Sequence, residues 1–239
     1  DLGEDFDAVF ETCAGQGYRG INVTYPYKER AAGMVSIATP IVRRIGAVNT
    51  VIFEPDGPKG YNTDFTGIIA AYRGTRGAAL PGVACLIGTG GVGRALAFGL
   101  VSLEAEEIRL VDQNTSKAEA LASDLRAIPH GPRVEVYGDA ESAAWGATGL
   151  LNGTPVGMVG YGGTPLPREA MKDAEWAFDA VYTPVDTEFL QDAAAQGLKV
   201  ISGYELFFYQ GIHAWAHFAG LPLDEARLRA DLLDQGEAA

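Results

Sequence analysis

An apolar run that passes directly into a glycine-rich turn stands at residues 83 to 93 of this chain. The apolar run VACLI at 83–87 is followed by Gly88, Gly90 and Gly93 with the spacing GxGxxG. The helix-compatible segment RALAFGLVSL comes next. A strand, a tight turn and a helix in this order bind pyrophosphate, because glycines let backbone N–H groups approach it and the helix N-terminus attracts negative charge. The segment therefore predicts a dinucleotide site whose turn consists of Gly88, Gly90, Gly91, Val92 and Gly93.

A second apolar run, EIRLV at 107–111, ends in Asp112. An acidic residue about twenty positions after such a turn accepts hydrogen bonds from the adenosine ribose. The chain has 31 glycines, so the alternative is an ordinary structural turn. The order of strand, turn, helix, strand and acid favours the nucleotide site. Beyond it, apolar runs alternate with helical segments up to residue 203, which predicts a doubly wound α/β domain with parallel strands and right-handed crossovers.

The charge balance limits what the chain can bind. Lys and Arg total 18 against 31 for Asp and Glu, and the formal net charge is −13, which argues against a nonspecific hold on nucleic acid or an anionic membrane. No apolar run is long enough to span a bilayer, and the acidic first residues are unlike a signal peptide. The two cysteines, Cys13 and Cys85, form no disulfide framework, so we expect a reducing, cytoplasmic location.

The segment RGTRGAALPG at 73–82 is rich in glycine and poor in periodic apolar residues, which is typical of a domain boundary. We predict a smaller α/β substrate-binding domain over 1–76, a dinucleotide-binding domain over 77–204, and C-terminal helices over 205–239 that pack back on the first domain. In the first domain we expect an initial amphipathic helix, a strand in RGINVTYP, a helical stretch near 28–45, a strand in AVNTVIF and a turn at 54–60.

Polar residues follow successive elements of the first domain. Thr24 and Lys28 lie in GINVTYPYKER, Asn49 in AVNTVIF, and Asp64 in GYNTDFTGI. Taken singly, a lysine is usually a surface residue, and the others could serve turn or strand-end hydrogen bonds. An ammonium, an amide and a carboxylate at successive element ends, in a domain that would face the nucleotide site, together predict a site for a polar small molecule.

Seven motifs in order, NVTxPxK, AVNT, GxNTD, GxGGxGR, NGTPxGM, YxPxxT and QG, resemble the shikimate dehydrogenase family, including its quinate/shikimate branch. The resemblance runs from about residue 16 to the end. It implies a substrate domain, a doubly wound NAD(P) domain, and an oxidoreductase that interconverts a ring hydroxyl of shikimate or quinate with the corresponding ketone. It also implies a small-molecule substrate and a place in the route to chorismate, and a homodimer is compatible with it.

The resemblance assigns roles to individual residues. Lys28 and Asp64 become the catalytic pair. Oxidation removes the hydroxyl proton as hydride leaves carbon, so Lys28 either accepts the proton or stabilises the developing charge. The further residues that the family motifs imply are, for the substrate, Thr24, Asn49, Gln210 and Tyr182, and for the nicotinamide half of the cofactor, Asn152, Thr154 and Gly203. Taken alone, Asn152 could be a simple Asn-Gly turn and Tyr182 a core residue.

The chain departs from the family pattern at three places. The family's Ser-x-Ser segment, which binds the substrate carboxylate, has no counterpart, and we expect the chain to begin after it. GYEL at 203–206 replaces the usual GxGM. DQN at 112–114 stands where NADP-dependent members carry Asn-Arg-Thr. A carboxylate at Asp112 accepts hydrogen bonds from a ribose diol but repels a phosphate, which favours NAD over NADP, although Lys117 weakens that inference.

Other functions are compatible with parts of the sequence. His213 and His217 lie four residues apart on an expected helix, but no Glu follows the first histidine and no third ligand is evident, so we expect no metal site. A catalytically silent, nucleotide-responsive regulatory module would need only the glycine turn. A dehydrogenase of an amino-substituted shikimate analogue is the other alternative, and a panel of substrates distinguishes all three.

Overall fold

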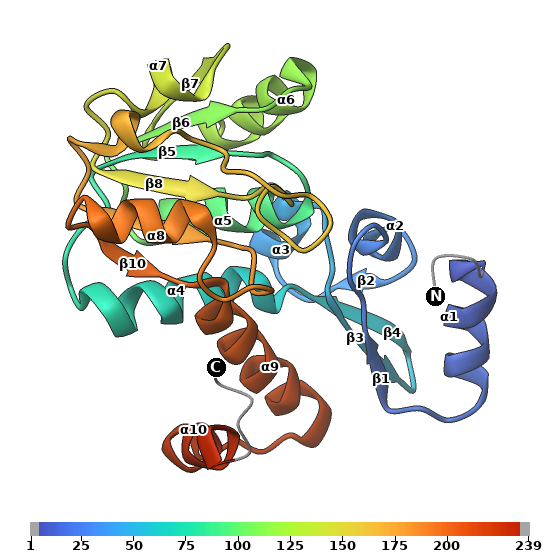
Figure 1. Cartoon of the computed structure of the whole chain (residues 1–239). Coiled ribbons are helices and arrows are strands. Elements are labelled where there is room, and N and C mark those ends of the chain that lie inside the picture. The colour runs from blue at the N-terminus through green and yellow to red at the C-terminus, as the bar shows by residue number, and fades with distance from the viewer. Residues whose placement is uncertain (1–4, 235–239) are drawn as a thin grey trace. The chain divides into compact units, whose positions relative to one another are not determined.

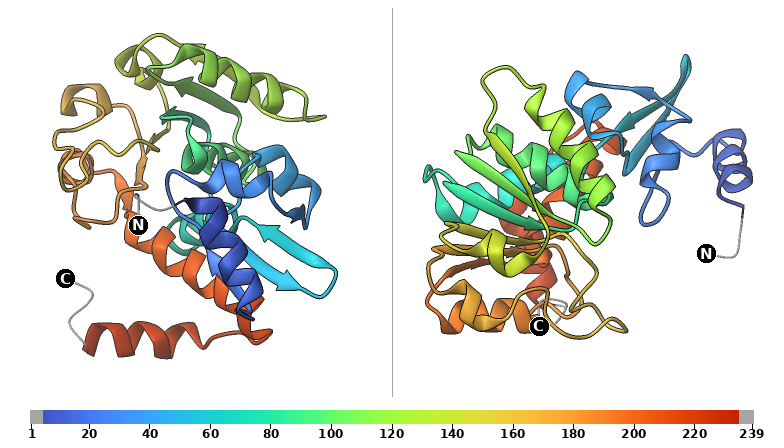
Figure 2. Two further views of the ribbon diagram at one scale, coloured as in Figure 1. Left: turned by 90° about the vertical axis from the view of Figure 1, so that its right-hand side faces the viewer. Right: turned by 90° about the horizontal axis from the view of Figure 1, so that it is seen from above.

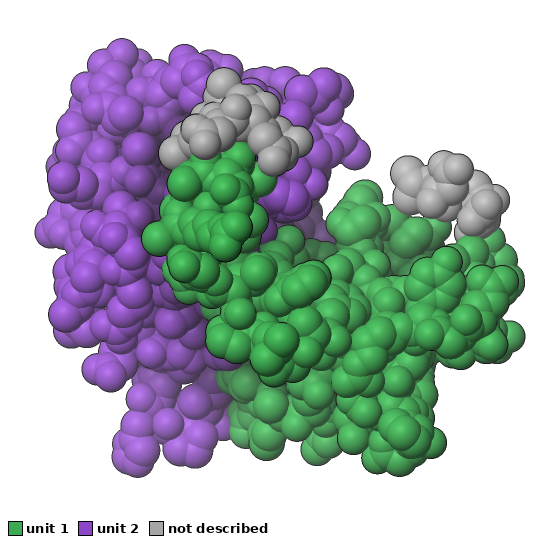
Figure 3. All heavy atoms as spheres, turned by 90° about the horizontal axis from the view of Figure 1, so that it is seen from below, with its two compact units in different colours: residues 1–63, 210–239 green, residues 64–209 purple. Residues whose placement is uncertain are grey.

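The structure, a computed structural model, describes residues 5–234. The chain divides into two compact units, which Figure 3 colours separately: unit 1 contains residues 1–63 and 210–239, and unit 2 contains residues 64–209. Helices α4 (Thr63–Arg76) and α9 (Gly203–Ala219) both run across a boundary between the units. The predicted domain limits fall at the end of α4 and near the start of α9, and they stay a prediction about folding units.

Unit 1 is built on a small mixed sheet (Figure 1). Its elements are α1 (Phe6–Gly15), β1 (Gly20–Asn22), α2 (Lys28–Ala32), β2 (Ser36–Ile37), α3 (Pro40–Ile45), β3 (Thr50–Glu54), β4 (Gly57–Tyr61), the second half of α9, and α10 (Glu225–Asp234). The strand order is β1-β3-β4-β2. Strand β3 is antiparallel to both β1 and β4, and β2 is parallel to β4. The core beneath this sheet is aliphatic and aromatic, with Phe10, Val23, Val42, Val48 and Val51 at its centre.

The single helical stretch expected near 28–45 is wrong, because two short helices flank a strand there. Helix α2 ends at Ala32 with Gly33 as its C-cap, and residues Ser36 and Ile37 are extended and pair with β4. Thr39 is also extended, as a residue before proline tends to be, and its side chain accepts the N–H of Val42. Pro40 then opens α3, where its missing N–H costs nothing.

The turn expected at 54–60 contains most of strand β4. Glu54 pairs with Gly57, so only two residues connect β3 to β4. Gly57 has φ of +120°, a conformation that L side chains rarely adopt. Gly60 faces the core so closely that a Cβ there would lie 2.4 Å from Cγ2 of Val35. The strand was missed because its glycines and proline are poor strand formers, and their reasons, the positive φ of Gly57 and the crowding of Gly60 by core side chains, are visible only in the structure.

The end of α9 packs on the sheet of unit 1. A Cβ on Gly20 would lie 2.7 Å from the Phe218 ring, so β1 needs glycine where this helix passes. The His217 ring stacks on Tyr61 of β4 with centroids 3.9 Å apart. Residues far apart in the sequence therefore share one core in this unit.

Unit 2 contains a six-stranded sheet, which Figure 2 shows from two further directions. Its elements are the rest of α4, β5 (Val83–Ile87), α5 (Gly91–Ser102), β6 (Glu107–Val111), α6 (Thr115–Arg126), β7 (Arg133–Tyr137), α7 (Ala140–Ala144), β8 (Gly149–Asn152), η1 (Arg168–Met171), β9 (Trp176–Asp179), α8 (Glu188–Ala195), β10 (Lys199–Ile201) and the start of α9. The strand order is β10-β9-β8-β5-β6-β7, and every pair is parallel. The predicted doubly wound α/β fold is confirmed.

The strand order reverses direction beside β5. The chain moves from β5 outward to β6 and β7, then returns to form β8 on the other side of β5. Right-handed crossovers place α5 and α6 on one face and α7, η1 and α8 on the other. Cys85 and Ile87 of β5 accordingly share a core with Ala143 of α7, Met171 of η1 and Phe189 of α8. Ligands of such sheets bind at the carboxyl ends of the strands where the order reverses, between β5 and β8 here.

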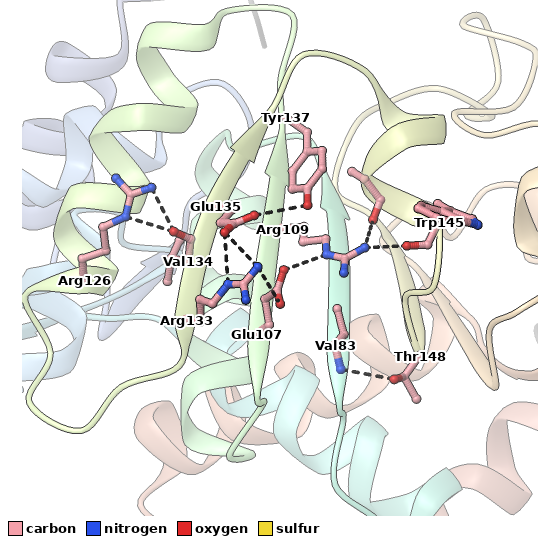
Figure 4. A network of polar contacts seen from close by, with 11 residues as sticks. Val83, Glu107, Arg109, Arg126, Arg133, Val134, Glu135, Tyr137, Trp145 and Thr148 are labelled. Carbon is pink, nitrogen blue, oxygen red and sulfur yellow. Dashed lines mark hydrogen bonds and ion pairs between the residues drawn. The ribbon is translucent and has the colours of Figure 1, made fainter.

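A polar network joins β6 and β7 away from the strand ends that carry the glycine turn (Figure 4). The buried Glu107 accepts a hydrogen bond from Arg109 at 2.7 Å and pairs with Arg133 at 3.5 Å. Arg109 also donates to the carbonyl oxygens of Ala143 and Trp145 at 3.0 and 2.7 Å. These bonds tie β6 and β7 to the end of α7, away from the strand ends that carry the glycine turn. Among the described residues, no helix has both the length and the apolar character needed to cross a bilayer.

Candidate active site

The glycine turn after β5 has the geometry that a dinucleotide needs. Gly88 adopts φ of +95°, and a Cβ on Gly93 would lie 2.1 Å from the Gly88 carbonyl oxygen. Any side chain at Gly93 would therefore push the turn away from α5. Gly90 differs, because a Cβ there would meet no atom within 4 Å. The space that Gly90 leaves open lies at the start of the helix.

Helix α5 begins with donors that no side chain caps. Gly90 is the N-cap residue and supplies no side-chain hydrogen bond to the first turn. The helix continues for 12 residues, so the positive end of its dipole adds to these N–H donors. An uncapped first turn next to open space fits the pyrophosphate of a dinucleotide, and Gly91 and Val92 supply its first helical N–H groups.

The loop after β8 lies directly against the glycine turn. The N–H of Gly153 donates to the carbonyl of Ile87 at 2.7 Å. A Cβ on Gly88 would lie 2.7 Å from Cγ2 of Thr154. The structure thus brings together the turn after β5, which the sequence predicts to bind the pyrophosphate, and the loop after β8, which it predicts to bind the nicotinamide half of the cofactor.

Asn152 shapes this loop from inside the protein. Its side chain is fully buried, and its Nδ2 donates to Asp179 Oδ1 and to the Val156 carbonyl, each at 2.9 Å. Its Oδ1 accepts the N–H of Thr154 at 3.0 Å and the Thr154 hydroxyl at 2.6 Å. All of its hydrogen-bonding capacity is therefore used within the protein. Asn152 therefore does more than form a simple Asn-Gly turn, because its side chain holds the shape of the loop after β8.

Asp112 ends β6 beside the glycine turn. Its Oδ2 accepts the N–H and the hydroxyl of Thr89, both at 2.7 Å, and its Oδ1 accepts the N–H of Asn114 at 2.8 Å. Partial burial acts to raise the pKa of Asp112, but these hydrogen bonds and Lys117 outweigh it, so the pKa lies below its usual value. The group is a carboxylate at neutral pH. Both acceptor sites of Oδ2 are used by Thr89, and Oδ1 keeps one acceptor site for a further donor.

The segment that carries Tyr182 lies against Gly203 at the start of α9. A Cβ on Gly203 would lie 2.2 Å from the Val181 carbonyl oxygen, so α9 begins in contact with the segment that carries Tyr182. The Tyr182 ring stacks on Phe207 with centroids 4.9 Å apart, and both side chains are about half exposed. Tyr182 is therefore not a core residue, and the alternative that would bury it is wrong.

Asn49 is the centre of a buried polar cluster in unit 1. Its side chain is 3% exposed, and its Oδ1 accepts the Thr63 N–H at 2.7 Å and the Thr50 hydroxyl at 3.0 Å. Its Nδ2 donates to the Thr63 hydroxyl at 3.0 Å. The Asn49 amide thereby satisfies an N–H at the start of α4, which would otherwise lack a partner within the helix. It fixes the position at which α4 begins, and Asp64, itself buried, is the next residue.

Backbone hydrogen bonds bring the segments that carry Thr24 and Lys28 close to Asn49. The carbonyl of Lys28 accepts the N–H of Val48 at 2.9 Å, and the carbonyl of Asn49 accepts the N–H of Val23 at 2.8 Å. The carbonyl of Thr24 accepts the N–H of Tyr27 at 2.9 Å, so a tight turn joins Thr24 to the start of α2. Thr24, Lys28 and Asn49 are therefore grouped in one unit, as their spacing in the sequence suggested.

Gln210, His213 and His217 lie on the part of α9 that belongs to unit 1. Burial lowers the pKa of both histidines below the usual value, and each also lies near a charged or titratable neighbour, Glu225 for His213 and His213 for His217. Across residues 5–234, no three His, Cys, Asp or Glu side chains gather as a metal site would require. The ring of His217 is instead used in stacking on Tyr61.

Sequence reasoning missed three side chains that organise these segments. The Thr63 hydroxyl accepts a hydrogen bond from the Asn49 amide, Thr89 donates two hydrogen bonds to Asp112, and Asp179 accepts one from Asn152. Asp179 had a signal that could have found it, because it ends the apolar run WAFD at the same sheet edge as Asn152. The two threonines carry no comparable signal, since threonine is common at turns and helix starts.

A doubly wound sheet with a glycine turn at its switch point, joined to a smaller α/β unit that carries a cluster of polar side chains, defines a two-unit dinucleotide-binding protein of the dehydrogenase type. Residues 2–51 match the family model for the shikimate dehydrogenase substrate binding domain. The chain belongs to the shikimate dehydrogenase family. This match and relatives that are 36% and 32% identical over 97% of the chain together confirm the predicted family.

Relatives with both cofactor types support this assignment. The shikimate dehydrogenase (NADP(+)) of Pseudarthrobacter chlorophenolicus is 36% identical over 235 residues, which are 97% of this chain and 80% of that protein. The quinate/shikimate dehydrogenase (NAD(+)) of Corynebacterium efficiens is 32% identical over 97% of this chain and 82% of that protein. Among solved structures, quinate dehydrogenase from Corynebacterium glutamicum in complex with NAD superposes with a TM-score of 0.86 at 31% identity, covering 97% of this chain and 83% of that one.

Proposed function

We propose that this chain is an NAD(P)-dependent dehydrogenase that interconverts shikimate with 3-dehydroshikimate, quinate with 3-dehydroquinate, or both. The observation that carries the proposal is the buried polar cluster around Asn49 in unit 1, to which backbone hydrogen bonds of Val23 and Val48 bring the segments that carry Thr24 and Lys28. Unit 2 of the same chain carries a dinucleotide turn. A nucleotide-binding module without chemistry has no need of that cluster. The names of the relatives point to the same two ring acids.

Lys28 and Asp64 are the proposed catalytic pair. The nicotinamide of the bound cofactor would take or give hydride, which leaves the proton of the ring hydroxyl for this chain to manage. The amine of Lys28 would accept that proton or stabilise the oxygen as charge develops on it, and the Asp64 carboxylate would hold Lys28 in place. The backbone next to Asp64 is held in position for this role, because the Asn49 side chain accepts the N–H of the preceding residue, Thr63.

The proposed substrate contacts come from hydroxyl and amide groups, as a polyol requires. Thr24 is exposed at the end of a tight turn, and Gln210 and Tyr182 add an amide and a phenol. Asn49 donates only one amide hydrogen of its Nδ2 to Thr63, and the second is the one we propose for a ring hydroxyl.

We further propose that NAD is preferred over NADP. The carboxylate of Asp112 is held charged at the end of β6 by hydrogen bonds from Thr89 and Asn114. A fixed negative charge there suits the two hydroxyls of an adenosine ribose and opposes a phosphate on the same ring. Relatives named for either cofactor exist, so the charge of Asp112 is the support for this preference.

We also propose a cytoplasmic location. Both cysteines are free in the structure, and burial raises the pKa of the Cys85 thiol to about 12, so this group is an unreactive core residue. A homodimer stays a prediction, which the molecular mass in solution by light scattering would test.

Steady-state kinetics of the purified protein with two cofactors and two acids test the whole proposal. The absorbance of reduced nicotinamide would be followed with NAD or NADP against shikimate or quinate. We expect turnover with at least one acid and a higher kcat/KM with NAD. Dinucleotide binding without turnover of either acid would contradict the proposal and favour a regulatory module, whereas turnover of an amino-substituted analogue alone would redirect the substrate assignment.

A further inference from the structure

A buried carboxylate that the proposed reaction does not use lies at the carboxyl end of β9. Asp179 is fully buried and pairs across the sheet with Asn152 of β8. Its Oδ1 accepts Asn152 Nδ2 and the N–H of Val181, each at 2.9 Å. Its Oδ2 accepts the hydroxyl of Thr187 at 2.5 Å. One side chain thus joins three segments at the edge of the sheet where the dinucleotide turn lies.

All three partners of Asp179 are donors. An amide N–H₂, a backbone N–H and a hydroxyl surround it, and an ionised carboxylate is the side chain that can accept from several donors without offering one of its own. Burial raises the pKa of Asp179 to about 6, and the hydrogen bonds from Thr187, Val181 and Asn152 act in the opposite direction. Keeping a carboxylate in such a place costs stability, which needs a reason beyond packing.

The bonds beyond Asn152 lead to the loop against the glycine turn. The Asn152 amide holds Thr154 and Val156 by three further hydrogen bonds. The same loop touches Gly88 through Thr154. A change in the direction of the Asn152 side chain would therefore alter the backbone that faces the start of α5.

Helix α8 holds Asp179 from the other side. Thr187 is the N-cap residue of α8, and its hydroxyl oxygen accepts the N–H of Leu190 at 3.3 Å while its hydrogen goes to Asp179. The cap of a helix packed into the core thus fixes one carboxylate oxygen, and the carboxylate in turn fixes Asn152. Binding sites depend on such supporting contacts to hold the residues that line them.

We infer that Asp179 is a positioning residue for the dinucleotide site, and that it acts through Asn152 to hold residues 152–156 in the shape that lines the cofactor. This inference rests on the proposed function for the identity of the ligand. The anchor itself, which is the hydrogen bonding of Asp179 to Asn152 and of Asn152 to the loop, does not depend on the proposed function. Every one of these contacts lies within unit 2 and is made without a ligand.

Two variants separate the anchor from the charge. Asp179→Ala removes the acceptors of Asn152, Val181 and Thr187 together. Asp179→Asn keeps an oxygen for Asn152 and Val181, and its amide can donate to Thr187. Buried hydrogen-bond donors that lose their acceptor are costly, so Asp179→Ala should loosen the hydrogen bonds that hold Asn152 and its loop. We therefore expect amide hydrogen exchange at residues 153–156 to become about tenfold faster or more. We expect the dissociation constant of NAD to rise by about as much. Asp179→Asn should stay within about threefold of the parent protein in both.

Asp139→Ala is the matched control. Asp139 is an aspartate of the same unit that caps α7 by accepting the N–H of Ser142 at 2.8 Å, so its loss lowers stability without touching the loop. Thr187→Val serves where Asp179→Ala fails to fold, and it should give a smaller change of the same kind, since only one oxygen of Asp179 loses its partner.

Hydrogen exchange is measured without cofactor, so it tests the anchor even in a protein that binds no dinucleotide. Equal exchange and equal NAD affinity in Asp179→Ala and Asp139→Ala would overturn the inference. Faster exchange in Asp179→Ala with unchanged NAD affinity would also overturn it, since the loop would then be anchored without serving the ligand. Absence of NAD binding by the parent protein would instead count against the proposed function.

Discussion

The Oδ1 atom of Asn49 accepts the backbone N–H of Thr63 at 2.7 Å, so a side chain at the start of β3 fixes the first turn of α4. The same amide donates to the Thr63 hydroxyl. Asp64, the proposed catalytic carboxylate, is the next residue along the chain. In the proposed reaction Asn49 would therefore have two roles: it would place Asp64 and offer its remaining amide hydrogen to the substrate.

Replacing Asn49 separates these roles. Asn49→Ala leaves the buried N–H of Thr63 and the hydroxyl of Thr50 without their acceptor, so we expect the free energy of unfolding to fall by about 1–3 kcal/mol. We also expect kcat/KM to fall at least about tenfold. Urea denaturation and steady-state kinetics measure the two effects. An unchanged free energy of unfolding with a raised KM would mean that Asn49 only binds substrate.

The glycines of the dinucleotide turn should respond differently to alanine. At Gly93 a Cβ would lie 2.1 Å from the Gly88 carbonyl oxygen, so Gly93→Ala should lower the free energy of unfolding by about 1–3 kcal/mol, as overpacked sites do. At Gly90 a Cβ would meet nothing within 4 Å, and φ is −70°, which alanine adopts easily. Gly90→Ala should keep the stability and weaken NAD binding, because the methyl group would occupy the proposed phosphate site.

Urea denaturation with NAD titration distinguishes these two outcomes. Similar losses of stability in both variants would show that the turn is only a structural connection. Undiminished NAD affinity in a stable Gly90→Ala protein would place the pyrophosphate elsewhere.

The dinucleotide-binding fold could be predicted from the sequence because its signals are local. Strands β5 and β6 are short apolar runs, the turn between β5 and α5 has its glycines at fixed spacing, and each element lies next to the one it packs on. In unit 1 the local signals were weaker. Strand β4 contains glycine and proline where strands usually carry β-branched residues, and its place depends on pairing with β3.

The polar partners in the candidate site could not be predicted, since they depend on how distant segments align. Asn49 and Thr63 are 14 residues apart, Thr89 and Asp112 are 23 apart, and Asn152 and Asp179 are 27 apart. Each pair forms because two element ends meet, and a shift of one residue in a parallel strand would turn Asp179 to the other face of the sheet. The sequence identifies residue types at element ends, but it does not say which of them bind one another.

Asp112 should control the choice between the two cofactors. Asp112→Ser removes a charge held close to its proposed ribose partner, so we expect the ratio of kcat/KM for NADP to that for NAD to rise at least about tenfold. Part of that change should be a loss with NAD, because Thr89 and Asn114 also lose their acceptor.

Glu119→Gln is the control for Asp112→Ser, since it removes an exposed charge from α6, which pairs with Arg126 at 3.5 Å. Its cofactor ratio should match that of the parent protein. Equal ratios in Asp112→Ser and Glu119→Gln would remove the physical basis for the NAD preference.

Lys28 should matter for turnover and not for cofactor binding. We expect Lys28→Met to lower kcat by about a hundredfold or more, which is the range of general acid–base catalysis, because the charge it serves develops only as the proton leaves the hydroxyl. The dissociation constant of NAD should change little. Lys59→Met is the control, because Lys59 is a partly exposed lysine of the same unit that pairs with Asp56 at 3.3 Å. Equal kcat in the two variants would exclude Lys28 from the mechanism.

The buried Asp179 should leave a signature in the pH dependence of stability. Its pKa is raised to about 6 by burial, so between about pH 4 and pH 6 the folded protein holds a proton that the unfolded chain has released. The contribution of Asp179 to the free energy of unfolding therefore falls as the pH rises through this window, by an amount on the order of 3 kcal/mol, and stays low above it. Asp179→Asn cannot ionise and should lack this fall.

The measurement is the difference in free energy of unfolding between Asp179→Asn and the parent protein, taken by urea denaturation at several pH values. It should grow in favour of the variant from pH 4 to about pH 6 and then level off. Asp139→Asn provides a control of opposite sign, because hydrogen bonds from Ser142 hold the pKa of that exposed carboxyl below its usual value. The ionised Asp139 stabilises the folded protein at pH values above the usual pKa of an aspartate, and this contribution is lost as the pH falls. Asp139→Asn should therefore be less stable than the parent protein near neutral pH. A difference for Asp179→Asn that stays constant from pH 4 to pH 8 would mean that this carboxylate ionises as it does in water, and that its three donors fully replace the solvent it has lost.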